Sequence, residues 1–144
     1  MNAAREFITN SAEETIAVGR QLSTILHPGQ LIVLHGNLGA GKTTLVKGIA
    51  EAFGAACEEN VTSPTFNLVH EYRGPNVTIF HIDLYRIDTE RELMTLGIDD
   101  LRSEPGAILL VEWGEKFDDT RSQSDGEITF EILGETQRRV SVRV

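Results

Sequence analysis

The sequence predicts an α/β fold: a single P-loop NTPase-like domain whose mixed central sheet has antiparallel hairpins and flanking helices. Two apolar runs, 30–35 and 107–111, have the length and composition of buried strands. The segment 44–53 follows the first run and has apolar residues at helical spacing. The segments 66–72 and 77–83 alternate between apolar and polar residues on either side of a short turn, so they predict an antiparallel hairpin and argue against an all-parallel sheet.

The remaining elements are expected in chain order around this centre. A short strand over 5–9 precedes a helix that begins at Asn10 or Ser11, because the four residues from Ser11 to Glu14 form a capping-box pattern. We further expect the end of this helix near 27–29, a helix over 89–96 with a further turn after Gly97, a charged loop over 116–126, and a terminal hairpin of 127–133 with 138–144. The whole of 1–144 is predicted to form the one domain.

Composition restricts the classes of function. The formal net charge of -9 argues against a chain that grips RNA or DNA by itself, although an acidic surface suits a basic partner protein. The only cysteine, Cys57, allows neither an internal disulfide nor a zinc cluster, and we expect it to be inert at a helix end. No apolar run reaches the roughly 18 residues of a membrane helix, and residues 1–6 lack a signal-peptide core. A reduced, cytoplasmic compartment is therefore expected.

The chain is organised around the stretch Gly36-Asn37-Leu38-Gly39-Ala40-Gly41-Lys42-Thr43-Thr44, which fits the phosphate-binding pattern G-x-x-x-x-G-K-[ST]. Its glycines allow backbone conformations that a side chain would forbid, and its N–H groups with the helix N-terminus form an anion-binding nest. Lys42 places a cation at the β- and γ-phosphates, and the Thr43 hydroxyl is a hard oxygen ligand for Mg²⁺. A glycine turn that binds nothing is disfavoured, because strand, spacing and the Lys-Thr pair all agree.

A P-loop ATPase also needs an acid at the end of a neighbouring strand. Glu112 follows the apolar run 107–111, and Asp83 follows the strand expected over 77–83. Both acids are expected outside the carboxyl ends of strands, where ligands bind in α/β sheets. We assign Glu112 to the metal and Asp83 to its water shell or the attacking water, although the two assignments can be exchanged. In the alternative, either acid merely caps a turn or pairs with an arginine.

Three further features lie near these motifs. Ser63 and Thr65 flank a proline in the loop between the P-loop helix and the Asp83 strand, where many P-loop NTPases sense the γ-phosphate; an ordinary Ser-Pro turn is the alternative. Trp113 is the only tryptophan and follows Glu112, but a lone tryptophan is more often part of a core than of a site. His81 should share a strand face with Asp83, two residues on, which makes it a candidate partner of the site.

Taken together, the motifs resemble those of the TsaE (YjeE) family, small bacterial P-loop ATPases needed for the threonylcarbamoyl modification of adenosine 37 in tRNAs that read ANN codons. The resemblance spans nearly the whole chain and rests on the P-loop, Val61-x-Ser63-Pro64-Thr65-Phe66, His81-x-Asp83-x-Tyr85-Arg86 and Glu112-Trp113. It implies Mg²⁺ on Thr43 and Glu112, a required Asp83, a switch-like loop at Ser63 and Thr65, and a helix start at Ser11 near the nucleotide. We therefore expect catalytic roles for Lys42, Asp83 and Glu112, a metal site of Thr43, Glu112 and Asp83, and ATP contacts from Ser11, Gly36, Asn37, Leu38, Gly39, Ala40, Gly41, Lys42, Thr43, Thr44, Ser63, Thr65 and Trp113.

The resemblance also implies partners. Family members join two proteins, TsaB and TsaD, and ATP hydrolysis, which is slow in isolation, resets that complex between turnovers. By this resemblance we expect tRNA to be met only indirectly and no membrane to be involved. One departure is Asn37, where the family often has Asp; this position is variable in the P-loop pattern, so we expect nucleotide binding to survive the change.

Two other classes of function compete with this interpretation. The first is a P-loop kinase that phosphorylates a metabolite, which needs an acceptor pocket and usually an arginine-bearing lid. The second is a binding module that uses GTP or ATP without hydrolysing it, but the Asn-Lys-x-Asp motif that reads guanine is absent from the sequence. No arginine finger is evident, and Arg86 is the best candidate for a catalytic cation within the chain.

Overall fold

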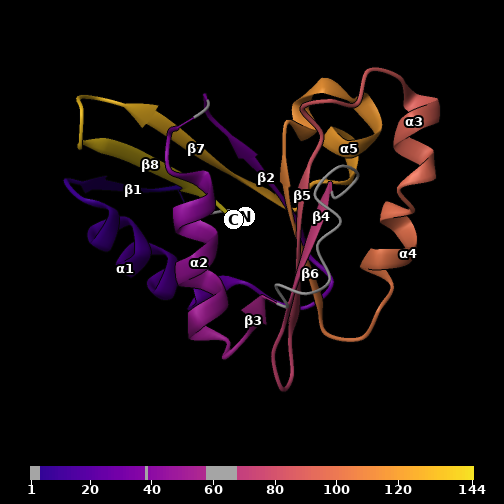
Figure 1. Cartoon of the computed structure of the whole chain (residues 1–144), viewed down its shortest axis with the longest axis horizontal. Helices are drawn as coiled ribbons and strands as arrows, with labels where there is room; N and C mark the ends of the chain where they lie inside the picture. The colour runs from indigo at the N-terminus through magenta and orange to yellow at the C-terminus, as the bar shows by residue number, and fades with distance from the viewer. Residues whose placement is uncertain (1–3, 38, 58–67) are drawn as a thin grey trace.

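The computed structural model describes residues 4–37, 39–57 and 68–144 of the chain. The strands in these ranges are β1 (Ala4–Thr9), β2 (Leu31–His35), β3 (Ala56–Cys57), β4 (Val69–Arg73), β5 (Thr78–Asp83), β6 (Ala107–Glu112), β7 (Gly126–Ile132) and β8 (Arg138–Arg143). They form one sheet in the order β1-β8-β7-β2-β6-β5-β4-β3 (Figure 1).

The centre of the sheet is parallel and its two edges are antiparallel. β2 pairs in parallel with both β6 and β7, and β5 pairs in parallel with β6. β4 and β3 extend one edge and β8 and β1 the other, all by antiparallel pairing. The α/β fold with a mixed sheet and both hairpins are therefore confirmed. The pairing of β1 with β8, which brings the two ends of the chain side by side, was not expected from the sequence.

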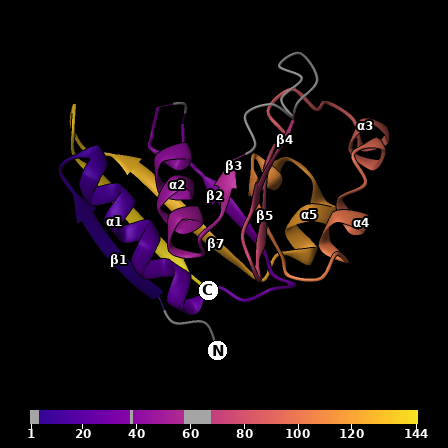
Figure 2. The same cartoon turned by 60° about the horizontal axis from the view of Figure 1, so that its bottom comes forward.

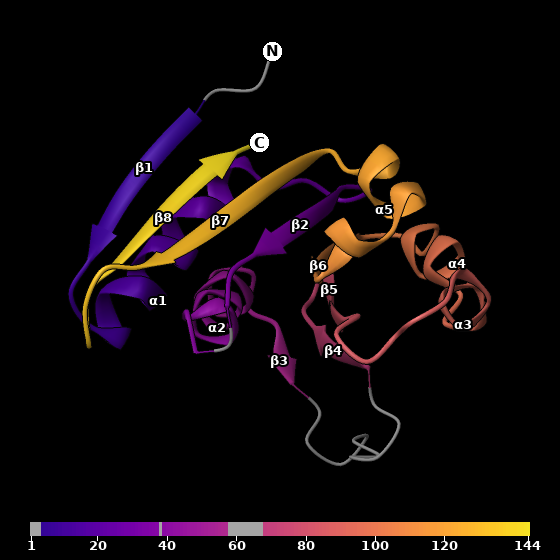
Figure 3. The same cartoon turned by 90° about the horizontal axis from the view of Figure 1, so that it is seen from above.

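Helices cover both faces of the central strands. They are α1 (Ala12–Leu22), α2 (Lys42–Ala52), α3 (Glu90–Thr95), α4 (Ile98–Arg102), α5 (Asp118–Gln123) and the 3-10 turns η1 (Ser23–Ile25) and η3 (Gly114–Lys116). α1 and α2 lie on one face, and α3, α4 and α5 lie on the other (Figures 2 and 3). In the described part of the chain, no helix is long and apolar enough to cross a bilayer.

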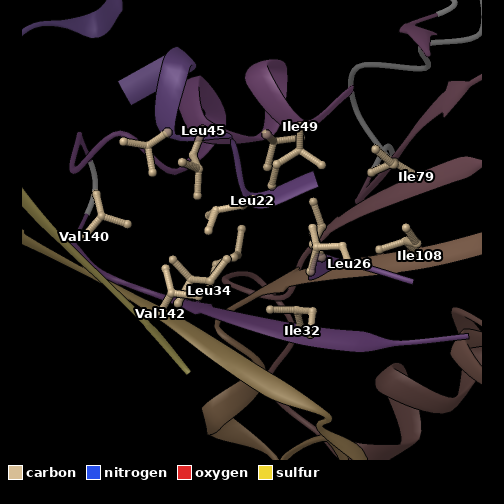
Figure 4. Close-up of a cluster of buried hydrophobic side chains, with 14 of the residues drawn as sticks. Leu22, Leu26, Ile32, Leu34, Leu45, Ile49, Ile79, Ile108, Val140 and Val142 are labelled. Atoms are coloured by element: carbon tan, nitrogen blue, oxygen red, sulfur yellow. The ribbon is translucent and has the colours of Figure 1, made fainter. Parts of the chain in front are cut away.

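Side chains that alternate along the central strands belong to two buried clusters, one on each face of the sheet. Ile32 and Leu34 of β2 point toward α1 and α2, where they pack with Leu22 and Leu45 (Figure 4). Leu31 and Val33 belong to the cluster on the opposite face, with the helices that follow β5 and β6. Because successive strand side chains point to opposite faces, a strand with four consecutive buried apolar residues, as in β2 over 31–34, is stable only between two helical layers.

Two glycines set the distance between α1 and α2. A Cβ added at Gly48 of α2 would lie 2.1 Å from the Ile16 carbonyl oxygen of α1, and one added at Gly19 of α1 would lie 2.4 Å from the Leu45 carbonyl oxygen. The backbones of the two helices therefore touch at this crossing. The crossing positions the start of α1 against the start of α2.

The start of α1 follows the expected capping box. The Ser11 hydroxyl accepts a hydrogen bond from the Glu14 N–H at 3.1 Å, and the Glu14 carboxylate accepts one from the Asn10 N–H at 2.9 Å. Ser11 is thus the N-cap. The helix ends at Leu22 and continues as the turn η1 to Ile25, two residues before the expected breaker cluster.

Two expectations were wrong. The charged segment 116–126 is not simply a loop, because it contains α5, which Phe117 and Thr120 anchor by burial while its aspartates stay exposed. α5 has only 6 residues, which are too few to show a clear helical period in the sequence. Cys57 is not at a helix end: α2 ends at Ala52, Gly54 reverses the chain at φ +68°, and Cys57 pairs with Tyr72 as part of β3.

Candidate functional site

The three strands that carry the predicted site end at one edge of the sheet. Glu112, the last residue of β6, is paired with Leu34 of β2 on one side and with Asp83 of β5 on the other. The P-loop leaves β2 immediately after this point. The parallel register therefore places the loop and both candidate acids at the carboxyl edge of the sheet, where α/β folds bind ligands.

The loop itself needs its glycines. Gly41 is the N-cap of α2 and has φ +103°, a left-handed conformation that disfavours any side chain. At Gly36, a Cβ would lie 3.0 Å from Cβ of Phe130, so the backbone lies directly against β7. The Ala40 N–H donates to the Asn37 carbonyl at 3.1 Å and closes a turn, while the Asn37 side chain is exposed.

The N-terminus of α2 has the features of an anion-binding site. No side chain caps its first turn, and that turn contains no acid. The other α-helices in the described ranges, α1, α3, α4 and α5, all have acids in the first turn. Thr43 is exposed and Thr44 half-buried on this turn. Because helix N-termini carry partial positive charge and unpaired N–H groups, the first turn of α2 favours phosphate.

Lys42 lies buried at the base of the loop, with 5% of its surface exposed. Its Nζ donates to the Gly36 carbonyl at 2.6 Å and lies 3.2 Å from Oε1 of Glu112. The same nitrogen is 5.0 Å from the ring centroid of Trp113. The lysine predicted for the phosphates is thus held by the first residue of the loop, the predicted metal ligand and the tryptophan.

Glu112 is engaged through both carboxylate oxygens. Oε1 faces Lys42, and Oε2 accepts a hydrogen bond from Nε2 of His81. Burial by itself raises the pKa of Glu112, but the hydrogen bond and charge of His81, followed by those of Lys42, outweigh it and hold this pKa below the ordinary 4.5. Glu112 is therefore ionised at neutral pH and suited to a cation.

Asp83 lies beside Glu112 but faces a different partner. Its Oδ1 accepts a hydrogen bond from the Tyr85 N–H at 2.9 Å, which forms the turn after β5. Lys116 closes the same turn from the other side, because its Nζ donates to the carbonyls of Leu84, Tyr85 and Ile87 at 3.3, 3.0 and 2.6 Å. The turns that follow β5 and β6 are thereby tied together.

Trp113 belongs to both a core and the site. It packs against the cluster that α3 and α5 cover, and its ring also lies 5.2 Å from that of Tyr85 and faces Lys42. Its φ of +63° is left-handed, which is rare for a bulky residue and is typical of functional positions. Its Nε1 is buried and has no hydrogen-bond partner among the described residues.

A hollow of about 270 Å³ opens beside the loop. It is lined by residues from the start of α1, the P-loop and the turn between β7 and β8: Ser11, Ala12, Thr15, Gly39, Gly41, Thr44, Glu135, Thr136 and Arg138. Arg138 Nη2 donates to the Gly39 carbonyl at 3.2 Å. Sequence reasoning placed Ser11 near the nucleotide only by resemblance, and this geometry brings it to the loop.

Most of the predicted residues converge, with several exceptions. Lys42, Glu112 and Trp113 are in direct contact, Asp83 adjoins them, and Ser11 lies across the hollow from the loop. The predictions for Leu38, Ser63 and Thr65 fall outside the described residues. Arg86 is exposed on the turn after β5. Sequence reasoning missed Lys116 and Arg138, because a lone basic residue in a loop or terminal hairpin belongs to no motif.

Fold and loop together define a protein of the P-loop class. The family model described as "Threonylcarbamoyl adenosine biosynthesis protein TsaE" matches residues 9–140. The chain is 36% identical to TsaE of Rickettsia felis, covering 94% of this chain and 77% of that one, and 35% identical to TsaE of Aquifex aeolicus, covering 99% and 98%. The crystal structure of Bacillus subtilis YdiB matches with a TM-score of 0.73 at 27% identity, covering 100% of this chain and 87% of that one. This chain belongs to the TsaE family.

Proposed function

We propose that this protein is a Mg²⁺-dependent ATP hydrolase that acts in the cytoplasm in the biosynthesis of threonylcarbamoyladenosine at position 37 of tRNAs that read ANN codons. Its matched relatives are named tRNA threonylcarbamoyladenosine biosynthesis proteins. The observation that carries the proposal is the buried contact between Lys42 and the ionised Glu112 beneath the uncapped start of α2. This contact supports the proposal, because it brings together a lysine that would serve the phosphates and a carboxylate that would serve a metal ion.

The donor set fits Mg²⁺. Thr43 offers a hydroxyl, and Glu112 and Asp83 offer carboxylates, so all three are hard oxygen ligands. Mg²⁺ usually takes only one or two carboxylates from a protein and fills its remaining positions with substrate phosphates and water. When bound, Mg²⁺ would neutralise charge on the β- and γ-phosphates.

The other side chains of the site have separate roles in binding the phosphates and in hydrolysis. Lys42 exchanges the Glu112 carboxylate for phosphate oxygens, and the N–H groups of the loop and α2 stabilise the charge that develops there. Asp83 orients the attacking water from the neighbouring strand end. Trp113 covers the buried Lys42 and limits the access of bulk water to it, which strengthens the electrostatic interactions beneath the ring.

The partners in this proposal are TsaB and TsaD, and tRNA is met only through them. Arg86, exposed on the turn after β5, stays the candidate for a catalytic cation within the chain, whereas Arg138 already donates to the Gly39 carbonyl and to its own hairpin. No contact among the described residues ties Arg86 to Lys42 or Glu112, so in this proposal a partner protein would supply the cation. Hydrolysis is therefore slow in isolation, as in GTPases without their activators, and permits repeated turnovers of the partner complex.

The test is Mg²⁺-dependent release of phosphate from ATP, measured for the protein alone and with purified TsaB and TsaD. We expect a low rate that rises many-fold with the partners and is lost in Lys42→Ala. Lys47→Ala, an exposed lysine on the same helix, is the matched control and should retain the rate. A fast rate that the partners do not change would contradict the accessory role, and transfer of phosphate to a metabolite would favour a kinase.

A further inference from the structure

We propose that His81 is a positioning residue that holds Oε2 of Glu112 and thereby presents Oε1 to the metal ion. This inference rests on the proposed function and adds a role for a residue that is itself neither a metal ligand nor in contact with phosphate. It is carried by the geometry around a single carboxylate, on which two buried cationic or hydrogen-bonding groups converge.

The two oxygens of Glu112 have different partners. Oε1 lies 3.2 Å from the Nζ of Lys42, and Oε2 accepts from Nε2 of His81. Nε2 is assigned as the donor of this hydrogen bond, because a carboxylate oxygen accepts. All three side chains are buried, with 5–6% of each residue exposed, so bulk water does not replace these contacts.

The two partners also differ in what they do during the cycle. Lys42 is the residue that moves to the phosphates, and its departure frees Oε1. His81 lies within β5, two residues before Asp83 and on the same strand face, so the sheet itself fixes its position. Oε2 therefore remains held while Oε1 is released, and the carboxylate cannot rotate to offer both oxygens or neither.

Residues that orient a metal ligand have an effect of typical magnitude on metal affinity. Removing the groups that orient metal ligands typically costs 10- to 100-fold in metal affinity or activity. A histidine that merely fills the core behaves differently, because its loss lowers stability without changing the metal dependence. The two roles are therefore separated by the concentration of Mg²⁺ needed to support nucleotide binding.

The chain offers a matched control for this comparison. His70 of β4 lies opposite His81 in the antiparallel register, with ring centroids 6.3 Å apart. The two histidines share a sheet face, but only His81 reaches Glu112 among the contacts of the described residues. His70→Phe thus repeats the change of ring on the same face without removing the hydrogen bond.

The experiment measures binding of a nonhydrolysable ATP analogue by the fluorescence of Trp113, the only tryptophan, with Mg²⁺ titrated from zero in the presence of each variant. We expect His81→Phe to raise the half-saturating Mg²⁺ concentration at least 10-fold, with affinity in EDTA within 2-fold of wild type. His81→Gln, whose amide N–H can donate, should recover part of the shift, and His70→Phe should match wild type.

Two results would overturn the inference. One is a Mg²⁺ requirement in His81→Phe that equals that of wild type. Another is an equal loss of affinity with and without Mg²⁺, which indicates a structural role. Should His81→Phe not fold, His81→Met takes its place, and thermal unfolding of each variant identifies which are folded. A wild-type protein whose nucleotide binding ignores Mg²⁺ would overturn the proposed function itself, a result distinct from the other two.

Discussion

The close glycine contact between α1 and α2 predicts that Gly48→Ala destabilises the protein, which is the opposite of what helix propensity alone predicts. Alanine is favoured over glycine inside a helix by about 0.8–1 kcal/mol, so Gly48→Ala on an unobstructed helix would stabilise the protein. Here the new Cβ would lie 2.1 Å from the Ile16 carbonyl oxygen and 2.9 Å from its carbonyl carbon. Both are backbone atoms of α1 and cannot rotate away.

The magnitude follows from the space required. Contacts below 3.0 Å are essentially never seen for real Cβ atoms, so the helices would have to separate by about 1 Å. Overpacking costs about 1–3 kcal/mol, and a clash with backbone belongs near the upper limit. After the gain in propensity, we expect a net loss of about 2 kcal/mol in the free energy of unfolding, or roughly 4–8 °C in Tm for a chain of this size.

Thermal unfolding of Gly48→Ala and of Lys47→Ala, its exposed neighbour, measures this effect. Lys47→Ala should stay within about 0.5 kcal/mol of wild type. Because α1 carries Ser11 beside the loop, we also expect weaker nucleotide binding in Gly48→Ala. An unchanged or higher Tm in Gly48→Ala would refute the close crossing and the reasoning built on it.

Three further predictions concern charged residues. Glu112→Gln should lower the free energy of unfolding at pH 7 by about 1.5–3 kcal/mol, because it removes a charged hydrogen-bond acceptor. Since the pKa of Glu112 lies below 4.5, the wild type keeps this extra stability above pH 4.5 and loses it as the pH falls further. Urea unfolding of both proteins from pH 7 to pH 3 measures the difference. Arg138→Met removes the hydrogen bond to the Gly39 carbonyl and should weaken nucleotide binding about 5-fold, or about 1 kcal/mol, in calorimetry; unchanged affinity would contradict this. Lys116→Met leaves three carbonyls without their donor and should lower the kcat of ATP hydrolysis at a temperature where the variant is still fully folded. A lower Tm with an unchanged kcat would show that Lys116 supports only the fold.

The sequence predicted what depends on local patterns. The P-loop, the apolar strands β2 and β6 and the capping box at Ser11 were all visible because each is defined within about ten residues. The resemblance to the TsaE family, which the comparisons confirm, rested on the order of such motifs. Glu112 was identified because an acid directly after an apolar strand has a defined place at the sheet edge.

The remainder depended on tertiary contacts. Nothing local indicates that β1 pairs with β8, since the two strands are separated by more than a hundred residues. The three carbonyls around Lys116 and the contact of Arg138 with Gly39 arise where loops meet, and no spacing in the sequence records them. His81 was expected on the face of Asp83, but its bond to Glu112 required the register of β5 with β6.

In the proposed function, ATP hydrolysis by this chain permits repeated turnovers of a tRNA-modifying complex. The most direct measurement is the amount of threonylcarbamoyladenosine formed in tRNA per TsaB–TsaD complex, with wild-type protein, with Glu112→Gln and with no added chain. We predict many products per complex with wild type and about one per complex in the other two reactions. Equal product in all three would contradict the claim.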